Sequence, residues 1–127
     1  MIDYNKLGKY IDNIYTGATE NSSRKIVTKL QGNTLTLNFR SIVNIGRNER
    51  NTDLDKRKRE LEKEAIQLIK AKKQEIQKSY NAESDVKLKI KEAKDANKIN
   101  TLELITFSPI SPVRTYKFSY CICFELS

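Results

Sequence analysis

The residue types that most often carry out catalysis are scarce in this 127-residue sequence, which contains no histidine. Without histidine there is no Ser–His or Cys–His nucleophile and no common metal cluster. The four glycines, Gly8, Gly17, Gly32 and Gly46, are isolated, so no glycine-rich loop can cradle phosphates. These absences predict a protein that is not an enzyme and that uses no small-molecule substrate, cofactor or metal.

Paired carboxylates are the one catalytic arrangement that the composition leaves open, because Asp and Glu number 16. Several of them lie among lysines on a stretch with helical periodicity, where pairing with a lysine four residues away explains them. A solvated helix face is therefore favoured over a catalytic pair of carboxylates. These residues are Glu60, Glu62, Glu64 and Glu75.

The two cysteines, Cys121 and Cys123, are expected on one strand. Residues two apart on a strand share a face, with Cα atoms roughly 6.5–7 Å apart, at or beyond the usual disulfide range. A metal site would need further ligands. We therefore predict two reduced thiols in a reducing compartment that coordinate nothing, which a bound zinc or an intramolecular disulfide in a mass spectrum would contradict.

A run of four basic residues, Lys56 to Arg59, is the sharpest functional signal. On a helix these residues spread over about 300°, so only some can face one partner. Together with more distant lysines they are candidates for phosphate contacts. A solvated helix start, balanced by nearby carboxylates, explains them equally. The candidate residues are Lys56, Arg57, Lys58, Arg59, Lys63 and Lys70.

The charge balance points to acidic partners without identifying them. Lys and Arg number 24 against 16 Asp and Glu, a net charge of +8. Such an excess favours nucleic acid, an anionic surface or an acidic protein face, and a basic solubility surface explains it too. The hydrophobic fraction of 38% is below the usual share. This low fraction predicts a thin, elongated domain that completes its core against a neighbour.

The elements that position these residues begin with a predicted amphipathic helix over residues 2–15, ended by Gly17. Residues 24–45 then change to a period of two, with a tight turn at Gly32–Asn33, which predicts a long hairpin. Its tip, Gln31 to Asn33, is expected to project from the body as a contact site. The expected buried face holds Leu35, Leu37, Phe39, Ser41, Val43 and Ile45, and Thr36, Asn38 and Arg40 lie on the other.

Residues 52–80 have the pattern of one continuous helix. Thr52 is expected to cap its start, with Asp53 and Asp55 near the positive end of the helix dipole. So narrow an apolar stripe predicts a helix that lies on a sheet by one side and leaves the rest in water. The stripe consists of Leu54, Leu61, Ala65, Leu68, Ile69, Ile76 and Tyr80, with Ile66 at its margin.

The C-terminal third alternates again. Residues 86–91 predict an edge strand with lysines outward, and residues 102–107 predict a second strand. For residues 93–100 the pattern is compatible with either a loop or a helical turn. The prolines within 108–112 end the preceding strand. The most regular strand is the last, with one apolar face made of Tyr116, Phe118, Tyr120, Ile122, Phe124 and Leu126.

These expectations add up to a single α+β domain over residues 1–127. An antiparallel sheet, made of the long hairpin and the C-terminal strands, packs against one long helix, with a short N-terminal helix. This element order, the Lys/Asn-rich composition and the closing strand around 114–120 resemble the small neck and tail-completion proteins of tailed bacteriophages, the tail-terminator group among them. The resemblance implies a ring of identical subunits that joins head and tail through the sheet and hairpin, without catalysis.

The leading interpretation is therefore a virion structural protein, made in the host cytoplasm, that forms a homo-oligomeric ring and binds other virion proteins. The alternative is a small basic nucleic-acid-binding or ribosome-associated factor that uses the basic run. The N-terminus lacks the pattern of a signal peptide, and no apolar run approaches the ~20 residues of a membrane span, so a membrane partner is not expected.

Overall fold

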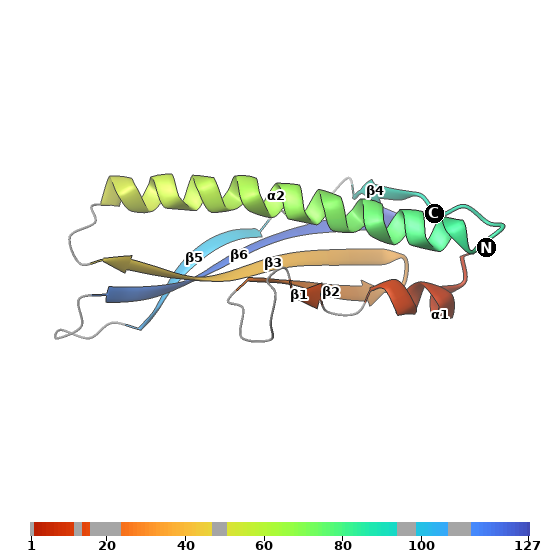
Figure 1. Cartoon of the computed structure of the whole chain (residues 1–127), viewed down its shortest axis with the longest axis horizontal. Coiled ribbons are helices and arrows are strands. Elements are labelled where there is room, and N and C mark those ends of the chain that lie inside the picture. Colours follow the sequence, from red (N-terminus) through yellow and green to blue (C-terminus); the bar gives the residue numbers. More distant parts are fainter. Residues whose placement is uncertain (1, 12–13, 16–23, 47–50, 94–98, 107–112) are drawn as a thin grey trace.

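The computed structural model describes residues 2–11, 14–15, 24–46, 51–93, 99–106 and 113–127. One long helix lies over one face of an antiparallel sheet, which confirms the predicted α+β class (Figure 1). The elements, in chain order, are α1 (Tyr4–Leu7), η1 (Gly8–Tyr10), β1 (Ile14–Tyr15), β2 (Lys25–Gln31), β3 (Thr34–Gly46), α2 (Asn51–Ala82), β4 (Ile90–Glu92), β5 (Ile99–Thr106) and β6 (Val113–Leu126).

The sheet is built around two long central strands. Its order is β1-β2-β3-β6-β4, and β5 also pairs with β6. The central strands β3 and β6 pair antiparallel from Thr34–Glu125 to Gly46–Val113. β4 covers one end of β6, and β5 covers the stretch from Thr115 to Cys121. β5 is therefore an edge strand that pairs, among the described residues, with β6 alone.

The hairpin of β2 and β3 is confirmed, with the turn at the predicted place. Gly32 has a φ of 60°, a conformation in which a side chain would be strained. The predicted alternation is also confirmed for the described side chains. Leu35, Leu37 and Phe39 are buried beneath α2, while Thr36, Asn38 and Arg40 are half-buried on the opposite face.

The long helix runs from Asn51 to Ala82, which confirms the predicted span to within two residues at each end. Because it begins at Asn51, Thr52 lies inside the helix and not at the position before it. The predicted stripe is right except at Leu54 and Leu68, which are half-buried. Lys72 lies on the buried line instead, 5% exposed between Ile69 and Ile76. The reason is the helical period, because steps of three and four residues from Ile69 reach Lys72 and Ile76.

The N-terminal prediction was wrong in its extent. The α-helix spans four residues, Tyr4–Leu7, continues as a short 3-10 turn to Tyr10, and Ile14 belongs to strand β1. The Asp3 side chain caps the short helix by accepting a hydrogen bond from Lys6 N at 3.1 Å. Glycine is a poor helix residue, and Gly8 is the C-cap that follows the last α-helical residue, Leu7. The predicted stop at Gly17 lies outside the described residues.

The start of α1 packs against the C-terminal end of α2, although the two segments are far apart in the sequence. The backbone N–H of Asp3 donates to the Tyr80 hydroxyl at 2.9 Å, and Tyr80 is fully buried. The Lys6 ammonium and the Tyr10 hydroxyl both donate to Glu83, to its carbonyl and its carboxylate respectively. Tertiary contacts, rather than helix periodicity, therefore fix where this segment lies.

The strand predicted over 86–91 is shorter than expected. β4 contains only Ile90–Glu92, and Val86 is 43% exposed. The alternation itself is right, because Leu88 and Ile90 are buried while Lys87 and Lys89 are exposed. The strand predicted over 102–107 is confirmed as β5, which begins earlier, at Ile99. The predicted break at 108–112 and most of the open segment 93–100 lie outside the described residues.

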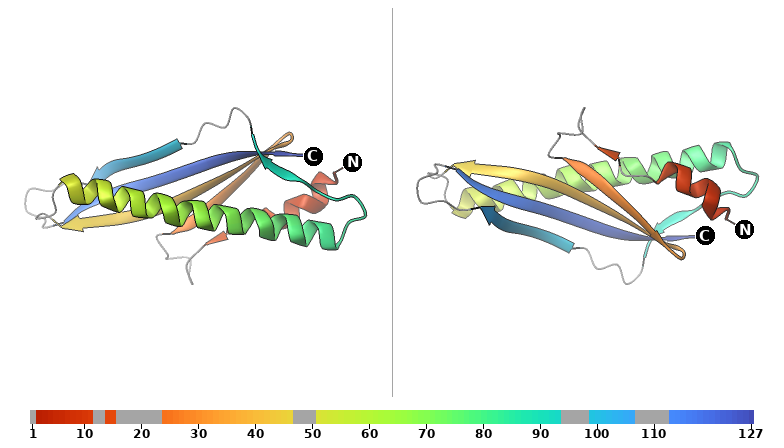
Figure 2. Two further views of the ribbon diagram at one scale, coloured as in Figure 1. Left: turned by 90° about the horizontal axis from the view of Figure 1, so that it is seen from above. Right: turned by 90° about the horizontal axis from the view of Figure 1, so that it is seen from below.

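The molecule has two layers, with the core between α2 and one face of the sheet. Within it the rings of Phe39 and Phe118 meet edge to face with centroids 6.0 Å apart. From above, α2 crosses the strands, and from below, β2, β3 and β6 are open to view along most of their length (Figure 2). We call the face beneath α2 the inner face and the opposite one the outer face.

Candidate functional site

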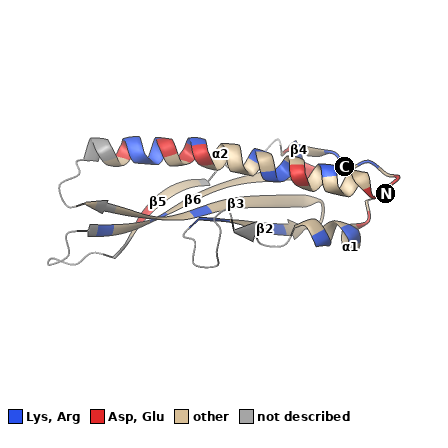
Figure 3. Cartoon of the chain, in the orientation of Figure 1, with Lys and Arg blue, Asp and Glu red and all other residues tan. Residues whose placement is uncertain are grey.

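The basic run on α2 is accessible but is mixed with acidic residues. Four of the six candidates, Lys56, Arg59, Lys63 and Lys70, are exposed, whereas Arg57 and Lys58 are half-buried. Acidic and basic residues alternate along the helix (Figure 3). The helix therefore presents no continuous stripe of one sign within its described part.

Two of the helix carboxylates are engaged in structural contacts. Glu64 forms an ion pair with Arg24 at 2.5 Å, and Glu62 accepts a hydrogen bond from the Asn100 side chain at 3.0 Å. Arg24 immediately precedes β2, and Asn100 lies on β5. These carboxylates thus tie α2 to the residues of the sheet.

The two candidate contact sites lie at opposite ends of the molecule. The basic run lies near the N-terminal end of α2, whereas the hairpin tip lies near the C-terminal end of that helix (Figure 1). Gln31, Gly32 and Asn33 are exposed, as expected of a contact site. The tip is nevertheless tied to the sheet, because Leu126 N donates to Asn33 O at 2.8 Å. It is part of the end of the sheet and not a free projection.

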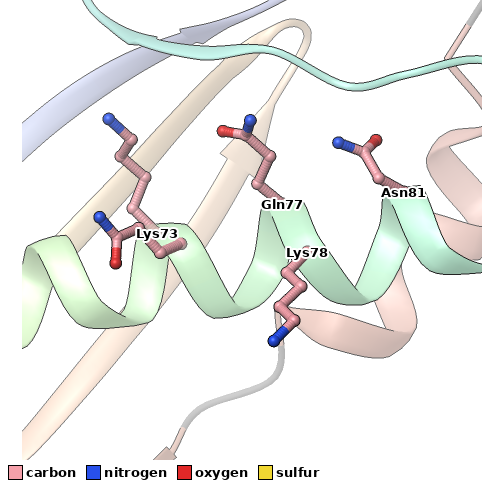
Figure 4. Close-up of a pocket in the computed structure, with 5 residues that line it drawn as sticks. Lys73, Gln77, Lys78 and Asn81 are labelled. Atoms are coloured by element: carbon pink, nitrogen blue, oxygen red, sulfur yellow. The ribbon is translucent and has the colours of Figure 1, made fainter.

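A cavity of about 310 Å³ lies along the C-terminal half of α2. Lys73, Gln77 and Asn81 point toward the segment that leads into β4, while Lys78 points away (Figure 4). The Asn81 amide is already engaged, because its Oδ1 accepts from Leu88 N at 2.6 Å and its Nδ2 donates to Leu88 O at 3.3 Å. No carboxylate, thiol or hydroxyl is among the five described residues that line this cavity.

A second cavity, of about 210 Å³, lies between α2 and β6. Its floor is apolar, and the amine of Lys73 lies 5.6 Å from the centre of the Phe124 ring. A cation over an aromatic face is a stabilising contact in its own right. The lining residues are Ile66, Lys70, Lys73, Glu92, Tyr120, Ile122 and Phe124.

Two buried side chains, Lys72 and Cys121, have shifted pKa values that the sequence analysis did not predict. Burial lowers the pKa of Lys72, and Glu75, whose carboxylate lies 3.8 Å away, partly offsets this shift. Burial also raises the pKa of Cys121 to about 11, with a smaller effect from Cys123. Both thiols are free and lie on β6. A thiol held protonated is a poor nucleophile.

Strand β5 is the main feature that the sequence analysis did not single out. Leu104 is 50% exposed, and Glu103 is the only charged residue of the strand. The segment that leads into β4 carries exposed lysines at alternate positions, which discourages pairing with another strand. The scarcity of charge over 99–106 is the sequence signal that distinguishes β5 from that lysine-rich segment.

No family model matches the chain, and neither a curated protein nor a solved structure matches it. In the part of the chain that the structure describes, no helix is long and apolar enough to span a membrane. No group of three or more potential metal ligands occurs among those same residues.

Proposed function

We propose that this protein is a non-catalytic structural protein that assembles into a homo-oligomer through the β5 edge of its sheet. The observation that carries the proposal is an edge strand of eight residues with a single charged side chain and a half-exposed leucine, Leu104. Such an edge presents backbone N–H and C=O groups that a second chain can pair with.

The chain has few of the usual protections on this edge. β5 contains no lysine, arginine or proline, and its only irregularity is a register shift between Leu104 and Thr106. A bulge of this kind bends the end of a strand and limits pairing there. The part available to a neighbour therefore runs from Ile99 to Leu104.

The element order supports a ring as the form of the oligomer, by its resemblance to the neck and tail-completion proteins of tailed bacteriophages. In a ring, β5 meets a different surface of its neighbour, whereas pairing of β5 with its own copy closes a two-fold dimer. On this proposal the protein belongs to a phage particle, where the ring joins other virion proteins.

The test is the molar mass of the purified protein by size-exclusion chromatography with light scattering. A mass of three or more chains supports the ring. A mass of two chains supports pairing through β5 but contradicts the ring, and a monomer at every concentration contradicts self-association.

Two exposed apolar residues provide the variant and its control. Leu104→Lys introduces a charge at the edge and should give a monomer with an unchanged circular dichroism spectrum. Val86→Lys makes the same change at an apolar residue that is 43% exposed but lies off the edge, and it should leave the mass unchanged. Equal effects of the two substitutions would show that β5 is not the contact.

The basic run provides the comparison with nucleic-acid binding. Changing Lys56, Arg57, Lys58 and Arg59 to glutamine should leave assembly intact. If this variant instead abolishes a salt-sensitive affinity for DNA or RNA, while Leu104→Lys changes nothing, the nucleic-acid alternative is the better one. Shortening the hairpin at Gly32 is a poorer test, because Asn33 is hydrogen-bonded to β6 and the change would disturb the sheet.

A further inference from the structure

Three cations that are far apart in sequence come together on the outer face of the sheet. Lys25 on β2 lies directly opposite Arg40 on β3, and Arg40 lies opposite Ser119 on β6. Lys117 lies two residues before Ser119, on the same face, so it is a diagonal neighbour of Arg40. Opposite residues in antiparallel strands have Cβ atoms about 4.5–5.5 Å apart, and diagonal neighbours are about 7–8 Å apart. We call Lys25, Arg40 and Lys117 the outer-face cluster.

Among the residues that the structure describes, no carboxylate forms an ion pair with the cluster, although Glu103 lies opposite Lys117. No ion pair or side-chain hydrogen bond involving Lys25, Arg40 or Lys117 is found within the described part of the chain. The Arg40 Nε is buried without a hydrogen-bond partner, as is the Oδ1 of Asn38, two residues earlier on the same face. Like charges directly opposite each other destabilise a sheet, and a buried donor without a partner adds a further cost.

We propose that the outer-face cluster binds an acidic segment of a partner protein, whose carboxylates pair with Arg40 and its two lysine neighbours. A carboxylate bound there would accept from the Arg40 guanidinium and separate the charges of Lys25 and Arg40. Arginine suits this task because its planar group can donate two parallel hydrogen bonds to one carboxylate. The partner relieves the repulsion between Lys25 and Arg40 in the isolated domain.

The surroundings of the cluster fit a protein partner better than a nucleic acid. Ile42 lies opposite Lys117 and is 41% exposed, so an apolar contact is available beside the cations. Glu103 lies opposite Lys117 on its other side and is exposed. This carboxylate repels any long anion that continues across the sheet, so the site suits a short acidic segment that spans only Lys25 to Lys117. Apolar and cationic side chains together are typical of protein interfaces.

This inference goes beyond self-association and does not depend on it, because the cluster belongs to one chain and lies on a face of the sheet rather than at its edge. The β5 edge would hold identical subunits together, and the outer face would hold a different protein. If either proposed contact is disproved, the other is unaffected, because Leu104 is not part of the outer-face cluster.

The test uses the full chain and a fluorescently labelled peptide that carries several glutamates around one leucine. Its matched control is the same peptide with glutamine in place of glutamate, and a short single-stranded oligonucleotide serves as a polyanion. Binding is followed by fluorescence anisotropy at increasing sodium chloride. The acidic peptide should bind, the glutamine peptide should not, and the affinity should fall as salt screens the charges.

Substitutions then locate the site. Arg40→Gln and Lys117→Gln should each weaken binding of the acidic peptide about tenfold, the effect of losing one charged hydrogen bond. Lys70→Gln, which removes a charge from the helix on the opposite side of the sheet, should have no effect. Lys117→Gln keeps the test valid if Arg40→Gln fails to fold, which circular dichroism would reveal.

Three results would overturn the proposal. One is the absence of any binding of the acidic peptide to the wild-type chain. Another is equal weakening by Lys70→Gln and Lys117→Gln, which would indicate an effect of net charge alone. The third is tighter binding of the oligonucleotide than of the acidic peptide, lost in Lys117→Gln, which would assign the cluster to nucleic acid.

Discussion

The two faces of the sheet are made by the same strands and differ in how deeply their side chains are buried. On β6, Phe118, Ile122 and Phe124 point toward α2 and are almost completely buried. Their neighbours Lys117 and Ser119 point to the outer face and are only half-buried. Because side chains alternate along a strand, one sequence supplies both a core and an accessible outer surface. Stability therefore resides on the inner face, and the proposed recognition resides on the outer face and the edge.

The two faces should differ most in the stability that is lost when one apolar side chain is removed from each. Phe118 is fully buried against Phe39, and Phe118→Ala should lower the free energy of unfolding by about 3–5 kcal/mol. Ile42, on the outer face, is 41% exposed, and Ile42→Ala should cost less than about 1 kcal/mol. Urea unfolding measures both, and similar costs would mean that the outer face is also covered.

A second comparison tests the orientation of α2. Ile69 is fully buried, so Ile69→Ala should lower the free energy of unfolding by about 2–5 kcal/mol. Leu68 is half-buried, and Leu68→Ala should cost less than half as much. The same unfolding measurement decides this. A larger effect at Leu68 would mean that the helix is rotated from the orientation described here.

How much of the fold the sequence predicts depends on how far apart in the sequence the contacting residues are. The alternation of β3 and β6 and the stripe of α2 follow from local periods, so the hairpin, the long helix and the layer order are predicted correctly. Residues 2–15 have a helical period too, but hydrogen bonds from Asp3 to Tyr80 and from Tyr10 to Glu83 hold this segment on α2. These contacts join residues more than seventy positions apart, and no local pattern encodes them.

The candidate site was less predictable for the same reason. The run Lys56 to Arg59 is conspicuous because its residues are consecutive, yet the helix separates them. Lys25, Arg40 and Lys117 are separated in sequence and come together only through the register of three strands. Which face a residue occupies can be predicted from alternation, but its opposite neighbour on another strand cannot.

A smaller effect is expected at Asn81, whose amide holds the chain as it leaves α2. Asn81→Ala removes both hydrogen bonds to the backbone of Leu88, a residue that is 1% exposed. The free energy of unfolding should fall by about 1–3 kcal/mol, because the Leu88 N–H and C=O lose their partner. Thermal unfolding followed by circular dichroism measures the change. A variant as stable as the wild type would show that water or another group replaces the amide.

The smallest expected effect is a gain. Lys72 is charged on the otherwise apolar line of α2, so Lys72→Met should raise the free energy of unfolding by about 1 kcal/mol at neutral pH. Burial lowers the pKa of Lys72 in the folded state, so between that pKa and 10.5 the unfolded chain binds more protons. Wild-type stability should therefore rise with pH relative to the variant, and the advantage of Lys72→Met should shrink. A variant less stable than the wild type at neutral pH would contradict this.

The most direct test of assembly through the β5 edge is amide hydrogen exchange at two protein concentrations, one above and one below the point at which the oligomer dissociates. The amides of β5 should be protected at the higher concentration and exchange faster on dilution. The amides of Thr34 to Arg40 in β3 and of Thr115 to Cys121 in β6, which lie in stretches paired on both sides within one chain, should exchange at the same rate in both samples. Exchange of β5 at one rate at both concentrations would contradict the account.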